Sequence, residues 1–235
     1  MPGEKQVDRN QLANRSGGVG PPAYRGGPLR TRVYIDGFNL YYGALRRTPY
    51  RWLDLGTLAR RLLPRNDVVG IRYFTARVSA RGGDERQPQR QDTYLRALAT
   101  IPDLTIHYGH YLTHATSMRL AEPAAWGAAF AKVLKTEEKG SDVNLATLLL
   151  LDAFRSECEV AVVITNDSDL RLPIEVARRE LGITVGVVNP HPPKRRSRAL
   201  EADFFRQLRE GTLRASQFPA QLRDEHGLIH KPARW

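Results

Sequence analysis

The chain has almost no cysteine, since Cys158 is the only one among its 235 residues. A single thiol excludes an intramolecular disulfide and a cysteine-rich zinc site. This usage predicts a reducing setting, and we expect the protein in the cytoplasm. Long apolar runs are lacking as well: residues 1–30 contain no signal-peptide core, and residues 145–154 (LATLLLLDAF) are too few to cross a bilayer. We therefore expect no membrane partner.

Acidic residues are in the minority. Lysine and arginine number 36 against 25 aspartates and glutamates, which gives a formal net charge of +11. This balance favours an anionic partner, nucleic acid first. The alternative is a charge that only keeps the protein soluble or reflects an arginine-favouring genome. The sequence has no glycine-rich loop ending in Lys-Ser/Thr and no second Asp two residues after Asp36, which disfavours a nucleoside-triphosphate enzyme and an Asp-nucleophile phosphatase.

The length suits one domain with tails. Residues 1–29 are rich in Gly, Pro and Arg without periodicity, and this composition predicts a disordered basic arm. Residues 30–210 form the expected domain. Residues 211–235 carry scattered apolar side chains, including Phe218 and Trp235, and we expect this C-terminal tail to pack on the domain.

Short apolar runs alternate with helical patterns along the domain. Strands are predicted at residues 32–36, 68–78, 104–112, 160–166 and 183–189. Helices are predicted at residues 53–64, 90–100, 142–154, 172–182 and 204–211. This alternation predicts an α/β fold in which helices cover both faces of a mainly parallel central sheet.

Carboxylates follow the predicted strands at the points where they end. Asp36 ends the first strand, Asp167 and Asp169 follow another, and Asp142 begins the long apolar helix. Each alone is an ordinary turn or N-cap residue, but the carboxyl ends of parallel strands meet at one edge, so all four should converge there. Such a cluster needs a hard divalent cation, Mg²⁺ or Mn²⁺, and suits phosphodiester hydrolysis. The amide of Asn39 could hold a water or a carboxylate.

Three segments carry a resemblance to a known family: "YIDGFNL", "EEKGSDVNLA" and "VVITNDSDLRLPI". In this order they resemble the NYN family (LabA-like proteins) of the PIN-like nuclease superfamily, over roughly residues 32–207. The resemblance implies a Rossmann-like PIN fold and metal-dependent ribonuclease activity. The family's acidic positions match Asp36, Asp142, Asp167 and Asp169, which implies their role as metal ligands and catalytic residues, with Asn39 as the motif asparagine. The family often has Ser-Gly-Asp where this chain has Thr165, Asn166 and Asp167, and a non-glycine residue there restricts the turn.

Two basic loops should flank the acidic centre, because each follows a predicted strand. The expected nucleic-acid-binding residues are Arg77, Arg81, Arg86 and Arg90 in the first loop and Lys194, Arg195, Arg196 and Arg198 in the second. Phosphate contacts would supply affinity there, although both loops could instead be merely solvated. Glu137 and Glu138 are interpreted as solvated, with a role next to the metal ligands as the alternative. Of the tyrosines near the first motif, most are expected to pack in the core rather than to stack on bases.

The leading hypothesis is a metal-dependent endoribonuclease that uses Mg²⁺ or Mn²⁺ and acts on RNA, with DNA as an open second substrate. The alternative is a non-catalytic nucleic-acid-binding or adaptor module whose acidic edge holds a structural ion. The sequence leaves open whether the chain forms a homo-oligomer.

Overall fold

A computed structural model describes residues 27–80, 84–122, 127 and 129–234. The basic arm expected at residues 1–29 therefore falls almost entirely outside the described residues, as do Arg81 and Trp235.

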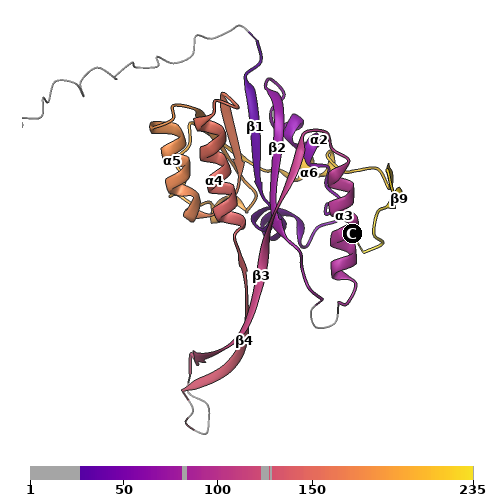
Figure 1. Ribbon diagram of the computed structural model, residues 1–235, viewed down its shortest axis with the longest axis vertical. Coiled ribbons are helices and arrows are strands. Elements are labelled where there is room, and N and C mark those ends of the chain that lie inside the picture. Colours follow the sequence, from indigo (N-terminus) through magenta and orange to yellow (C-terminus); the bar gives the residue numbers. More distant parts are fainter. Residues whose placement is uncertain (1–26, 81–83, 123–126, 128, 235) are drawn as a thin grey trace, which may run out of the picture.

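A seven-stranded sheet forms the centre of the molecule (Figure 1). Its strands lie in the order β4-β3-β2-β1-β5-β6-β7, and all neighbours are parallel except β3 and β4. The bounds are β1 Arg30–Asp36, β2 Asp67–Ala76, β3 Leu104–Arg119, β4 Phe130–Lys139, β5 Val160–Ile164, β6 Thr184–Asn189 and β7 Phe204–Gln207. The predicted α/β fold with a mainly parallel sheet is confirmed.

Helices cover both faces of this sheet (Figure 1). One face carries α2 (Leu55–Leu62), α3 (Gln87–Ala99) and α6 (Glu210–Arg214), and the other carries α4 (Ser141–Phe154) and α5 (Arg171–Arg179). Four short helical segments lie in the connections: α1 Gly37–Leu40, η2 Tyr41–Leu45, η3 Ser168–Leu170 and η4 Pro193–Arg195. None of the helices in the described ranges has the length and apolarity needed to span a membrane.

The core has two halves, one on each side of the sheet. Val33 and Ile35 of β1 point toward α2 and α3, whereas Tyr34 points toward α4 and α5, because successive side chains of a strand face opposite ways. The five residues of β5 are all buried. Strands buried on both faces are what a parallel sheet with two helical layers requires.

The segment after residue 203 differs from its predicted structure. The helix expected at residues 204–211 is wrong, because residues 204–207 form β7, which pairs with β6 at the sheet edge. The Phe204 ring lies against Gly186, where a side chain on β6 would collide with it. The spacing of the apolar residues suited a helix, but packing on the sheet overrides that local preference.

The C-terminal segment packs against the α2 and α3 face. Phe218 is buried beside Trp52, whose indole Nε1 donates a hydrogen bond of 2.8 Å to the carbonyl of Pro219. The hairpin of β8 (Gln221–Asp224) and β9 (Gly227–His230) follows, and Asp224 forms an ion pair of 2.7 Å with Arg96 of α3. These contacts make the segment part of the same hydrophobic core as the domain.

A long two-stranded arm projects from the sheet (Figure 1). The strand predicted at residues 104–112 continues to Arg119, and its antiparallel partner β4 was not predicted at all. The sequence of β4 contains Lys and Glu at half of its positions, a composition depleted in strands, so only its pairing with β3 reveals it.

We expect Phe218→Ala to destabilise the protein by about 3–5 kcal/mol, because it removes a buried ring from the core beside Trp52. Urea denaturation measures this loss. The matched control is Leu228→Ala, since Leu228 is 53% exposed and its truncation should change stability by no more than about 0.5 kcal/mol. Equal and small effects of both substitutions would show that the C-terminal segment is not part of the cooperative fold.

Candidate functional site

The site begins where β1 ends. Asp36 caps the short helix α1, and its Oδ1 accepts a hydrogen bond of 2.9 Å from the backbone N–H of Asn39. Gly37 permits this sharp turn, because a Cβ at that position would lie 2.5 Å from the carbonyl oxygen of Phe74 and 2.8 Å from Oη of Tyr73. The chain therefore turns directly against β2 and leaves Asp36 at the edge of the sheet.

Two hydrogen bonds join the end of β1 to the end of β5. The Thr165 hydroxyl donates to Oδ2 of Asp36 at 3.0 Å, and the N–H of Asn166 donates to Oδ1 of Asn39 at 2.9 Å. Both carboxylate oxygens of Asp36 are thus engaged, and the residue is only 4% exposed. The amide oxygen of Asn39 therefore holds the loop that follows β5.

The turn after β5 accommodates Asn166, where the family often has glycine. Asp167 accepts a hydrogen bond of 3.0 Å from the N–H of Asp169, so it is an N-cap, as the ordinary interpretation of such residues suggests. Asn166 does not need the left-handed backbone that glycine favours, since the described non-glycine residues with positive φ lie elsewhere. Its side chain accepts from the N–H of Ser197 at 2.7 Å and donates to the carbonyl of Arg195 at 2.9 Å. These bonds anchor the second basic loop beside Asp167.

A cleft of ≈ 310 Å³ opens over these groups. Four of the five residues predicted for the metal and catalytic site line it: Asp36, Asn39, Asp142 and Asp167. Asp169 is exposed on η3 and does not line the cleft. The structure thus brings three of the four predicted metal ligands to one hollow.

The arm supplies residues that the sequence interpretation missed. Tyr111 of β3 and Thr136 and Glu138 of β4 also line the cleft. Glu138 accepts hydrogen bonds from the N–H and the hydroxyl of Ser141, at 3.1 and 2.6 Å, and so holds the start of α4. Its interpretation as a solvated residue is therefore wrong. No capping pattern in the sequence marks Glu138, because the N-cap is Gly140 and a capping box has its Glu after the cap, not before it.

Burial and mutual repulsion raise the proton affinity of the acidic residues. Burial, with the charges of Asp142 and Asp167, raises the pKa of Asp36 to about 7, against the opposing hydrogen bonds from Asn39 and Thr165. Burial and the charges of Asp167, Glu138 and Asp169 raise the pKa of Asp142 to about 6. With all its carboxylates ionised, the cleft therefore carries more negative charge than it readily accommodates at neutral pH.

The fold and these motifs agree with comparisons to known proteins. The NYN domain model matches residues 30–206. The chain belongs to the NYN domain family. A relative from Pseudomonas putida, 6-hydroxy-3-succinoylpyridine 3-monooxygenase HspA, is 33% identical over 239 residues, which cover 88% of this chain and 76% of the relative. A solved structure of a Vibrio parahaemolyticus protein of unknown function, VPA0982, is 18% identical with a TM-score of 0.50, and the match covers 80% of this chain and 97% of that one. The resemblance to the NYN family is confirmed, and the fold is PIN-like.

The donor atoms of this NYN domain suit a hydrated divalent cation. Within the described ranges, no three His, Cys, Asp or Glu side chains are grouped closely enough to hold a metal ion on their own. Mg²⁺ keeps several waters and is usually bound through one or two carboxylates, so it does not require such a group. Asp36, Asp142 and Asp167 offer only oxygen ligands, and the raised pKa values of Asp36 and Asp142 mean that a nearby positive charge would stabilise their ionised forms.

The predicted nucleic-acid-binding residues of the NYN domain lie outside the cleft. None of the seven described members of the predicted set lines the cleft. Arg77 pairs with Asp92, and the Arg196 guanidinium lies 3.5 Å from the centre of the Phe205 ring. Lys194, Arg195 and Arg198 are exposed on the loop that Asn166 anchors.

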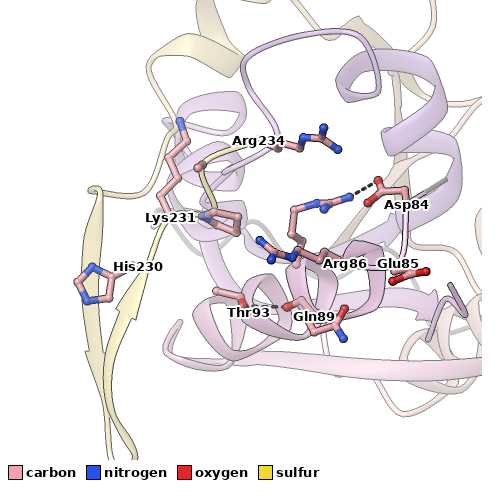
Figure 2. Close-up of a pocket in the computed structure, with 11 residues that line it drawn as sticks. Asp84, Glu85, Arg86, Gln89, Thr93, His230, Lys231 and Arg234 are labelled. Atoms are coloured by element: carbon pink, nitrogen blue, oxygen red, sulfur yellow. Dashed lines mark hydrogen bonds and ion pairs between the residues drawn. The ribbon is translucent and has the colours of Figure 1, made fainter.

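Arg86 and Arg90 line a different hollow, of ≈ 710 Å³, between the start of α3 and the C-terminal segment (Figure 2). Lys231 and Arg234 lie on its other side, and Asp84 pairs with Arg90 (Figure 2). These two predicted nucleic-acid-binding arginines therefore line a hollow that contains none of the predicted metal ligands.

We expect the metal-free wild type to lose stability relative to Asp36→Asn as the pH rises. The pKa of Asp36 is raised in the folded state to about 7 from about 4 in the unfolded chain, so its contribution is fully present below pH 4 and is lost as the pH rises through 7. The loss should be on the order of 3–4 kcal/mol. Asparagine can retain the hydrogen bonds with Asn39 and Thr165. Urea denaturation in EDTA between pH 4 and 8 measures the difference.

The control for this experiment is Asp67→Asn, which changes an exposed carboxylate at the opposite edge of the sheet. A constant difference between wild type and Asp36→Asn across the pH range would contradict the raised pKa of Asp36.

Proposed function

We propose that this NYN domain is a metal-dependent endoribonuclease. The observation that carries the proposal is the convergence of Asp36, Asp142 and Asp167 on one cleft at the carboxyl ends of the parallel strands. The family model supports a PIN-like nuclease, and the net charge of +11 suits a polyanionic substrate.

The carboxylates would divide the work of hydrolysis. Asp36, Asp142 and Asp167 would hold Mg²⁺ or Mn²⁺, which when bound offsets charge on a phosphoryl oxygen and lowers the pKa of water. Asp36 is fixed by hydrogen bonds from two elements, so it supplies a rigid position. Asp142, at the start of α4, lines the same cleft and would complete the set of carboxylate ligands. Asn39 acts as a positioning residue, because its amide oxygen holds the loop that carries Asp167.

RNA would reach the carboxylates past a rim of aromatic and basic groups. Tyr42 lines the cleft and is 57% exposed, so its ring can stack on an unpaired base. Lys194, Arg195 and Arg198 lie on the loop beside Asp167, where they can contact phosphates. Single-stranded RNA fits this arrangement, since its unstacked bases are accessible to an aromatic side chain.

A second candidate function comes from the Pseudomonas relative, whose name describes a monooxygenase acting on a hydroxylated pyridine. The observation that favours it is the set of aromatic side chains around the cleft, namely Phe38, Tyr42 and Tyr111. Oxygen consumption with 6-hydroxy-3-succinoylpyridine and a reduced nicotinamide, in the absence of RNA, tests this candidate. Oxygen uptake that depends on the pyridine, without RNA cleavage, would replace the nuclease proposal.

We expect Asp167→Asn to abolish RNA cleavage supported by Mg²⁺ or Mn²⁺ and to reduce the thermal stabilisation that these ions produce. Asparagine preserves the N-cap to the N–H of Asp169, so the metal-free melting temperature should stay equal to that of the wild type or exceed it. Asp67→Asn is the matched control and should leave cleavage and metal response unchanged. If Asp167→Asn kept full activity and full metal-induced stabilisation, Asp167 would be a capping residue only and not a metal ligand.

We expect the double substitution Lys194→Glu and Arg195→Glu to weaken binding of single-stranded RNA. It should also flatten the salt dependence of binding, by a slope of about 0.7 for each phosphate that the variant no longer binds. Both side chains are exposed, so the fold should be unaffected. The control is Arg60→Glu with Arg61→Glu, exposed in the last turn of α2. Equal losses of affinity in both double variants would mean that only net charge matters, and the loop would have no specific role.

A further inference from the structure

A second hollow adjoins the acidic cleft. It measures ≈ 260 Å³ and lies between α1, η2, the end of β2 and the start of α3. We call it the tyrosine pocket, after the aromatic residues that line it: Phe38, Tyr41, Tyr42, Tyr73, Tyr94 and Tyr111. Phe38, Tyr42 and Tyr111 also line the acidic cleft, so the two hollows share a wall.

The pocket is built for a flat ring. Six aromatic side chains line it, and aromatic side chains pack favourably on another planar ring. Its volume lies just below the usual range for small-molecule sites, about 300–1,000 Å³, so it accommodates one ring system with small substituents. Gly37 also lines it, and the turn there lies close to Tyr73 and Phe74, with no room for a side chain between them.

The charges that line the pocket are predominantly positive. Arg46, Arg51 and Arg90 line it together with one acidic residue, Asp84, and Asp84 is paired with Arg90. Arg46 lies 5.3 Å from the centre of the Tyr42 ring. In the described part of the chain, neither Arg46 nor Arg51 has an ion pair. Two guanidinium groups are thus left to receive an anion.

Arg51 carries the sharpest sign of a missing partner. Its Nε is buried and has no hydrogen-bond partner among the described residues. A buried donor without a partner costs roughly 1–3 kcal/mol, and hydrogen bonds to charged groups are stronger than neutral ones. This atom is closed to solvent, but Arg51 lines the pocket, so a carboxylate or phosphate there would pair with the charge of its guanidinium group.

We propose that the tyrosine pocket binds a planar heteroaromatic ring that carries an anionic group. The ring packs among the tyrosines, and the anion is held by Arg51 and Arg46. Two sources share this chemistry: a nucleotide, whose base fills the pocket next to the scissile phosphate, and a small heteroaromatic carboxylic acid. The inference deepens the proposed function and rests on it only for the nucleotide source. Ligand binding in the pocket requires neither metal nor turnover.

Calorimetric titration of the metal-free full chain in EDTA tests the proposal. Two probes, uridine 5′-monophosphate and 6-hydroxynicotinate, have both a ring and an anionic group. Uridine has the ring alone, and ribose 5-phosphate has the anionic group alone. We expect at least one of the first two to bind at least tenfold more tightly than both single-feature probes. Ribose 5-phosphate binding as tightly as the best ring-bearing anion would overturn the proposal, because the site would then recognise charge only.

Arg51→Met should weaken the better ring-bearing anion about tenfold or more and leave the affinity for uridine unchanged. Arg46→Met provides a second variant, since Arg46 is exposed and its substitution should not perturb folding. The matched control is Arg155→Met, an exposed arginine after the C-terminus of α4, at the opposite edge of the sheet. An unchanged affinity in Arg46→Met and in folded Arg51→Met would exclude the pocket as the anion site.

The two sources are told apart by the preferred probe: tighter binding of the nucleotide assigns the pocket to RNA, and tighter binding of the hydroxynicotinate assigns it to a small acid. RNA cleavage, assayed separately with Mn²⁺, depends on the carboxylates. Cleavage without ligand binding in the pocket therefore rejects this inference alone, whereas ligand binding without cleavage rejects the nuclease alone.

Discussion

The hydrogen bonds that join the end of β1 to the end of β5 are the interaction on which the site depends. Asp36 and Asn39 bind Thr165 and Asn166 across the two central strands of the parallel sheet. Because these groups are buried or half-buried, leaving any of them without a partner would be costly, so the arrangement is tightly determined. The same bonds place Asp167 and, through Asn166, the loop at residues 195–197.

This arrangement stabilises the backbone while it concentrates negative charge. Asp36 caps the turn at the end of β1 and is also a carboxylate of the cleft. Its burial at this position disfavours the ionised form and raises its pKa. Functional sites commonly hold such unfavourable charges, since the surrounding fold supplies the compensating stability. The large buried core on both faces of the sheet provides it here.

The arm and the tyrosine pocket extend the site beyond the carboxylates. Tyr111 belongs to both the cleft and the pocket, while Glu138, across from it in the β3–β4 ladder, anchors the start of α4 that carries Asp142. Gly109 allows this close approach, because a side chain there would collide with Glu138. A single element thus connects the acidic chemistry to the neighbouring aromatic surface.

The sequence by itself determined the parallel sheet and most of its acidic edge. Buried strands are marked by short apolar runs, and the carboxyl ends of parallel strands must meet, so Asp36 and Asp167 could be placed together without coordinates. Tertiary structure alone decided the rest. Residues 204–207 became a strand because β6 offered an unpaired edge, and β4 exists only through its ladder with β3. The tyrosine pocket gathers Arg51, Tyr73 and Tyr111 from separate elements, and no local pattern records contacts that the folded chain makes over such distances in the sequence.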